Sequence, residues 1–153
     1  QKEINMKLIR HSTFETNSSS CHTISVDRNS KIYEGFAPDQ NGVVYVRPAE
    51  FGWEQETYWS VDDKMSYVNI YINDWSGKHQ DNFREIFERV VKEHTGATEI
   101  VYVPSGEQYY PHGYIDHQSV EGADLDYLFQ SDECLKDFLF SPNSHIITDN
   151  DNH

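Results

Sequence analysis

Three groups of residues have types and spacings that suit chemistry, and the first is a Ser/Asn-rich segment near the N-terminus. Consecutive Ser and Asn residues between two strands present several N–H and O–H donors to one concavity, which is an arrangement that binds anions. Basic side chains flank the segment, so a phosphate-bearing ligand would fit it. The residues of this candidate ligand-binding site are Arg10, His11, Asn17, Ser18, Ser19, Ser20 and His22.

An enzyme built on this segment would need a general base, and His22 and His117 are the candidates because histidine titrates nearest to neutral pH. Cys21 precedes His22, but adjacent residues on a strand point to opposite faces and cannot act on each other. The sequence contains no Gly-x-Gly-x-x-Gly, no Gly-Lys-Ser/Thr loop and no Gly-x-Ser-x-Gly elbow. These observations favour a protein without catalysis, in which the segment is a hydrogen-bonded structural turn.

The second group is a set of histidines and carboxylates, which are residue types that bind divalent metals. Its members are His112, Asp116, His117, Asp149, Asp151 and His153. Their spacing matches no standard metal motif, and the Asp/Asn tail lacks the glycine and the closing glutamate of a calcium loop. We therefore expect a solvated loop and tail, with no metal and no other cofactor.

The third group combines aromatic and acidic residues in the second half of the chain. Tyrosine and tryptophan are common anchors of protein interfaces, and carboxylates beside them would select a basic partner. The residues of this candidate protein-binding surface are Tyr109, Tyr110, Tyr114, Asp124, Asp126, Asp132 and Asp137.

The distribution of charge supports a basic partner. The formal net charge is −14, from 26 Asp and Glu against 12 Lys and Arg. Residues 1–53 hold six acids and six bases, so the whole excess of carboxylates lies from residue 54 onward. Such a field repels nucleic-acid phosphates and anionic lipids. We expect a protein partner with a basic surface and no direct contact with nucleic acid or membrane.

The run from Phe14 to His22 reads Phe-Glu-Thr-Asn-Ser-Ser-Ser-Cys-His. It resembles a signature, Phe-Glu-Thr-Asn-Ser-Ser-Ser-x-His before a strand, of small bacteriophage and prophage proteins. Residues 116–119 and the closing Ile-Thr-Asp-Asn-Asp-Asn are also similar to that group. The resemblance implies a viral origin and no particular reaction. It places the protein in the cytoplasm of an infected bacterium, with a virion as the other setting.

Residue patterns predict an α+β domain with a small mixed or antiparallel sheet and about three helices, in the order β-β-β-α-α-β-β-α-β. Strands are expected at residues 7–10, 22–26, 43–46, 99–103, 115–119 and 145–148. Apolar stripes predict helices over 61–75 and 81–94, with a third between Ser131 and Ser141. We expect residues 1–5 to be an extension, residues 6–148 one domain and residues 149–153 a polar tail.

Two other features suggest a reduced, cytosolic setting. Cys21 and Cys134 are too few for a disulfide framework, and no apolar run approaches the length of a membrane span or a secretory signal. Two functions follow from the sequence. The preferred one is a phage-encoded accessory protein that binds a host or viral protein, with inhibition of a nucleic-acid-handling host factor as one form. The alternative is a small enzyme or ligand-binding protein that holds a phosphate-bearing ligand at the Ser/Asn segment.

Overall fold

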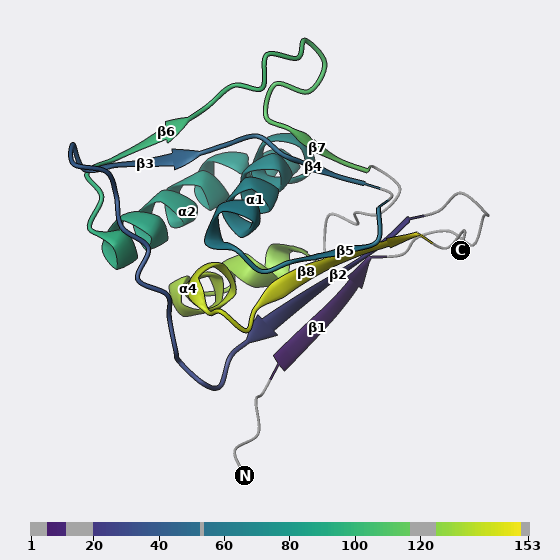
Figure 1. Ribbon diagram of the computed structural model, residues 1–153, viewed down its shortest axis with the longest axis horizontal. Helices are drawn as coiled ribbons and strands as arrows, with labels where there is room; N and C mark the ends of the chain where they lie inside the picture. Colours follow the sequence, from purple (N-terminus) through teal and green to yellow (C-terminus); the bar gives the residue numbers. More distant parts are fainter. Residues whose placement is uncertain (1–5, 12–19, 53, 117–124, 151–153) are drawn as a thin grey trace.

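The computed structural model describes residues 6–11, 20–52, 54–116 and 125–150. Four strands form an antiparallel sheet in the order β1-β2-β8-β5 along one face of the molecule (Figure 1). These strands are β1 (Met6–His11), β2 (Ser20–Asp27), β5 (Glu56–Tyr58) and β8 (His145–Asn150). Ile24 of β2 and Ile146 of β8 are neighbours in the register and are both completely buried. The apolar face of this sheet is therefore covered, and helix α4 packs against β2.

In the described part of the chain three helices form the layer beside this sheet, and each confirms a helix predicted from the sequence. They are α1 (Val61–Trp75), α2 (Gln80–Thr95) and α4 (Asp132–Phe140), with 3₁₀ turns η1 (Gly77–His79) and η2 (Asp126–Phe129). Local sequence determines their ends. The hydroxyl of Ser60 accepts a hydrogen bond from Asp63 N at 3.0 Å, and that of Ser131 accepts one from Cys134 N at 3.0 Å. Gly96 ends α2 in the left-handed conformation, with φ of 80°.

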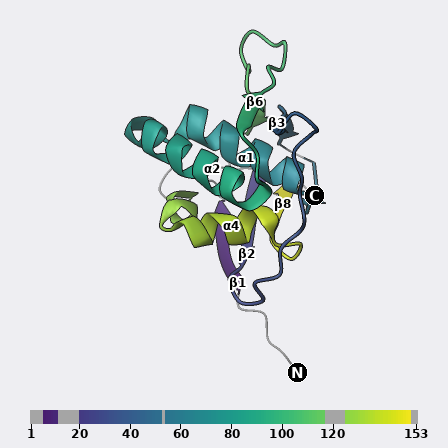
Figure 2. The same ribbon diagram turned by 90° about the vertical axis from the view of Figure 1, so that its left-hand side faces the viewer.

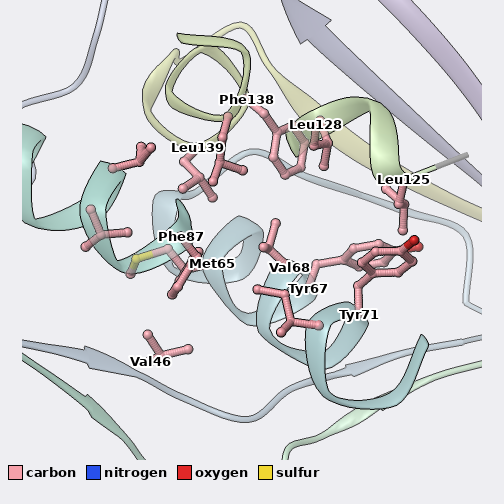
Figure 3. Close-up of a cluster of buried hydrophobic side chains, with 14 of the residues drawn as sticks. Val46, Met65, Tyr67, Val68, Tyr71, Phe87, Leu125, Leu128, Phe138 and Leu139 are labelled. Atoms are coloured by element: carbon pink, nitrogen blue, oxygen red, sulfur yellow. The ribbon is translucent and has the colours of Figure 1, made fainter. Parts of the chain in front are cut away.

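The hydrophobic core lies where the helices meet. Figure 3 shows Met65 and Val68 of α1 in one cluster with Phe87 of α2 and Phe138 of α4, and all four side chains are almost completely buried. Burial of each such side chain contributes about 1.5–3 kcal/mol relative to exposure. Because the same cluster includes Ile24 of β2 and Ile146 of β8, the core also holds the helical layer to the sheet.

Two short parallel pairs cover the other side of the helices (Figures 1 and 2). Strand β3 (Val43–Val46) pairs with β6 (Glu99–Tyr102), and β4 (Glu50–Phe51) pairs with β7 (Tyr114–Ile115). Backbone hydrogen bonds continue from one pair to the other, because Val103 N donates to Val46 O and Tyr114 N donates to Ala49 O, each at 2.9 Å. The two pairs thus form one ribbon, from which residues 104–113 leave and to which they return.

The α+β class and the order of the long elements are as predicted, but the strands are divided differently. The predicted small antiparallel sheet is present as the four-stranded sheet, and among the described residues two short parallel pairs accompany it. Strands β4 and β5 and turn η2 were not predicted, because elements of two to four residues are too short to show a periodic pattern. Part of the strand expected at residues 115–119 lies outside the described residues.

Two buried charged groups fasten the chain between α4 and β8. The ammonium of Lys64, on α1, is completely buried and donates to Ser141 O and Ser144 O, each at 2.8 Å. Burial lowers the pKa of Lys64 to about 8, and the carboxylate of Glu34 only partly opposes this shift. Asp27, at the end of β2, accepts hydrogen bonds from the side chains of Ser30, Ser141 and Asn143.

Candidate functional site

The clearest candidate site is the loop of residues 104–113, which projects from the ribbon (Figure 1). Its two ends are tied together by hydrogen bonds. Ser105 N donates to Pro111 O at 3.0 Å, and the Ser105 hydroxyl donates to Tyr110 O at 2.6 Å while it accepts from Glu107 N at 2.9 Å. A loop closed by its own hydrogen bonds presents its side chains in a defined arrangement, and compact loops of this kind are often functional.

Gly113 seats the returning end of this loop against residue 49. Its φ is 106°, in the region that favours glycine, and a Cβ atom there would lie 2.4 Å from Ala49 O and 2.8 Å from Ala49 N. Both contacts are far closer than side-chain atoms tolerate. Only glycine therefore allows the loop to close against the segment that joins β3 to β4.

A cavity of about 590 Å³ lies at the base of the loop. Residues 48–50 form part of its lining, and Ser105, Glu107, Tyr110 and Tyr114 form most of the rest. The rings of Tyr110 and Tyr114 meet edge to face, with centroids 4.8 Å apart and an interplanar angle of 65°. Aromatic pairs favour this geometry, so the two rings stiffen this wall of the cavity.

The cavity is acidic as well as aromatic. Glu50 and Glu107 contribute two exposed carboxylates, and none of the described residues that line the cavity is Lys or Arg. Its lining residues lie within residues 48–63 and 93–135, two stretches of sequence without a single Lys or Arg. Burial, together with the carboxylate of Asp116, raises the pKa of Tyr114, so this phenol stays neutral. Glu54, Glu56 and Asp62 follow β4 in the sequence and are exposed.

The three tyrosines predicted to bind a partner belong to this site. Tyr109 is 81% exposed and Tyr110 is 49% exposed, while Tyr114 is partly buried beside the cavity. Glu50 and Glu107 were not predicted as members. The absence of Lys and Arg from both stretches was a visible signal, but the pairing of β4 with β7 that joins them was not.

Asp137 was predicted to belong to the exposed surface, and the structure places it in the interior instead. Its carboxylate is completely buried and accepts hydrogen bonds from Arg28 Nε at 2.7 Å, Lys31 Nζ at 2.8 Å and the Tyr33 hydroxyl at 2.6 Å. Asp137 lies on the side of α4 that faces the chain after β2, so its charge is neutralised inside the protein. It is therefore not available to a partner.

Two of the other predicted aspartates also have partners within the protein. Asp132 forms two hydrogen bonds of 2.8 Å with the guanidinium of Arg89, and Asp126 accepts one of 2.5 Å from the Tyr71 hydroxyl. Asp124 lies outside the described residues. Among the described residues, these predicted aspartates are thus engaged inside the protein, whereas the exposed Glu50 and Glu107 line the cavity.

His22 was predicted to contact a ligand or act as a base, but the structure places it in the core. It is completely buried between Tyr67, whose hydroxyl lies 3.0 Å from Nδ1, and Gly52, whose carbonyl oxygen lies 3.2 Å from Nε2. Because the carbonyl can only accept, Nε2 carries the proton and Nδ1 accepts from Tyr67. Burial lowers the pKa of His22 and keeps it neutral, although Gly52 and Asp116 oppose the shift.

The rest of the predicted ligand-binding site is only partly described. Arg10 and His11 lie on β1, opposite Thr23 and His22 in the register, and Ser20 begins β2. Asn17, Ser18 and Ser19 lie outside the described residues, as does His117, the other candidate base. Asp116 N donates to Phe51 O at 2.9 Å, and the next residue, Gly52, contacts His22, so the fold brings the end of β7 near β2.

The predicted metal-binding group is also only partly described. His112 and Asp116 lie within the described residues, whereas His117, Asp151 and His153 lie outside them, and Asp149 is on β8. Within the described ranges, no three His, Cys, Asp or Glu residues gather closely enough to hold a metal ion. None of the helices in that part of the chain is long and apolar enough to cross a membrane.

Comparisons with known proteins add no assignment to this geometry. No protein-family model, curated protein or solved structure matches the chain significantly.

Proposed function

We propose that this protein is a non-enzymatic binding protein that engages a basic partner protein through the loop of residues 104–113 and the cavity at its base. One observation carries the proposal. Tyr109 is 81% exposed and Tyr110 is 49% exposed, and both lie on a loop whose ends are joined by its own hydrogen bonds. Exposed aromatic side chains on a preorganised loop lose little conformational entropy on binding and are frequent hot spots.

Charge supports a basic partner. The chain has a net charge of −14, and the two stretches of sequence that contain the lining residues of the cavity lack Lys and Arg. Carboxylates arranged in this way repel nucleic acid and speed the encounter with a positively charged surface. A protein that itself binds nucleic acid has such a surface, so the proposed partner class is a nucleic-acid-handling factor whose basic site the loop would cover.

The resemblance to small bacteriophage proteins suggests where this would happen. We propose a host or viral partner in the cytoplasm of an infected bacterium, with a virion component as the other setting. The alternative of a phosphate-binding protein has less support, because His22 is buried with both ring nitrogens engaged.

Capture from bacterial lysate tests the proposal. We expect the protein to retain a basic protein at low salt, and this retention to fall steeply between about 50 and 200 mM salt because the contact is electrostatic. The Tyr109→Ser/Tyr110→Ser variant should lose the captured protein. Ile32→Ser, at a 54% exposed position far from the loop in sequence, should retain it. Equal capture by both variants, or capture that is independent of salt, would refute the proposed role of the loop.

A further inference from the structure

The cavity at the base of the loop has a chemistry that selects one kind of side chain. Its lining joins the Tyr110 and Tyr114 rings to the carboxylates of Glu50 and Glu107. We propose that this cavity receives an arginine side chain of the partner. This inference rests on the proposed function, because it names the group on the basic partner that the site recognises.

A cation is the favoured occupant because two carboxylates line the cavity without a cation among its described lining residues. Arg47, the basic residue nearest in sequence to the lining of the cavity, contacts a different side chain. Its guanidinium lies over the ring of Tyr45, 5.4 Å from the centroid, and it does not line the cavity. Nor does the Ser105 hydroxyl compete for the carboxylates, since it donates to Tyr110 O. Glu50 and Glu107 therefore remain to accept hydrogen bonds from a bound cation.

Arginine fits this lining better than lysine. A guanidinium is planar, stacks on aromatic faces and carries five N–H donors, so it can contact a tyrosine ring and pair with two carboxylates together. An ammonium is compact, strongly hydrated and unable to stack. At about 590 Å³, the cavity has room for the guanidinium and part of its aliphatic stem.

The loop also explains why the cavity can be selective. Gly113 seats one end of the loop on Ala49, and Ser105 ties the other end to Tyr110 and Pro111. The aromatic wall and the carboxylate of Glu50 are thus held on two segments that are fixed to each other before a ligand arrives. Preorganisation of this kind reduces the entropy lost on binding.

The inference is tested with three probes that differ in one side chain: the peptides acetyl-Gly-Arg-Gly-amide, acetyl-Gly-Lys-Gly-amide and acetyl-Gly-citrulline-Gly-amide. Citrulline keeps the shape of arginine but carries no charge. Each peptide is titrated into the full chain and followed by NMR. We expect the arginine peptide to shift the ring resonances of Tyr110 and Tyr114 and to move its own Cδ protons upfield, with lysine weaker and citrulline without effect.

Variants locate the binding. Glu50→Gln/Glu107→Gln should weaken binding of the arginine peptide by about tenfold or more, since each lost charge-assisted hydrogen bond is sufficient for roughly that change. Glu99→Gln, which removes an exposed carboxylate from the opposite end of β6, should leave binding unchanged. Equal binding of arginine and citrulline, or shifts confined to other residues, would overturn the inference.

The proposed function and the assignment of the cavity can be refuted independently. If the protein captures a basic partner through Tyr109 and Tyr110 but Glu50→Gln/Glu107→Gln binds that partner normally, the cavity assignment is wrong and the function stands. If the arginine peptide occupies the cavity but no basic protein depends on the loop, the function is wrong and the cavity assignment stands.

Discussion

Replacing Gly113 by alanine should damage both the stability of the protein and the geometry of its candidate site. The new Cβ atom would lie 2.4 Å from Ala49 O, a backbone atom that cannot rotate away, and the backbone would have to keep a φ of 106°. Positive φ costs a non-glycine residue about 1–2 kcal/mol. Relief of the overlap would separate residue 113 from residue 49 and weaken the hydrogen bond from Tyr114 N to Ala49 O, for about 0.5–1.5 kcal/mol more.

We therefore expect Gly113→Ala to lower the free energy of unfolding by about 3 kcal/mol. For a chain of this length, that corresponds to a fall in Tm of roughly 6–12 °C. Gly106→Ala is the matched control, because Gly106 also has a positive φ, 85°, but a Cβ atom there would meet nothing within 4 Å. It should cost only about 1–2 kcal/mol.

Urea unfolding followed by tryptophan fluorescence measures both variants, with differential scanning calorimetry as the second readout. The comparison isolates the contact with Ala49 from the cost of the backbone conformation. If the two variants lose equal stability, the close approach of Gly113 to Ala49 does not exist in solution. The account of how the loop is seated would then be refuted.

Three further predictions concern buried charges. Burial lowers the pKa of Lys64 to about 8, from 10.5 in the unfolded chain, so the unfolded chain binds more protons between these pH values and stability should rise from pH 8 to pH 10. Lys64→Met should flatten this slope in urea titrations, and an unchanged slope would contradict the prediction. Burial opposes ionisation of Asp27, but hydrogen bonds from Ser30 and Asn143 lower its pKa to about 2, so the stability that its carboxylate contributes should disappear as pH falls from 4 to 2. Acid unfolding of Asp27→Asn should lack this loss of stability between pH 4 and pH 2. Asp137→Asn should lower the free energy of unfolding by about 2–4 kcal/mol, whereas Asp132→Asn, at an exposed pair with Arg89, should lower it by less than about 1 kcal/mol. Equal losses of stability in chemical unfolding would show that burial does not distinguish the two aspartates.

The long elements could be predicted from the sequence because their signals are local. Residues such as Met65, Val68 and Ile72 recur at helical spacing on α1, and Ser60 caps it as expected. The pairing of β4 with β7 has no local signal, because each strand has two residues and some sixty residues separate them. That non-local pairing is what places Glu50 beside the tyrosines of the loop.

The aspartates of the second half also show that non-local contacts cannot be predicted from local sequence. Asp132 and Asp137 lie five residues apart, on one helix, with the same side chain, yet one is exposed to solvent and the other is completely buried. Burial of Asp137 depends on Arg28, Lys31 and Tyr33, which are more than a hundred residues away in sequence. Composition located the excess charge correctly in the second half but could not determine which carboxylates remain free to meet a partner.

The central claim is that a basic protein contacts the loop of residues 104–113, and site-specific photocrosslinking tests it most directly. Tyr109→p-benzoylphenylalanine places a crosslinker at the most exposed tyrosine of the loop, and Ile32→p-benzoylphenylalanine places one at a control position. In lysate of bacteria at low salt, we expect position 109 to form a discrete covalent adduct with a basic protein and position 32 to form none. Adducts of equal yield from both positions, or no adduct from position 109 when the protein has captured its partner, would contradict the account.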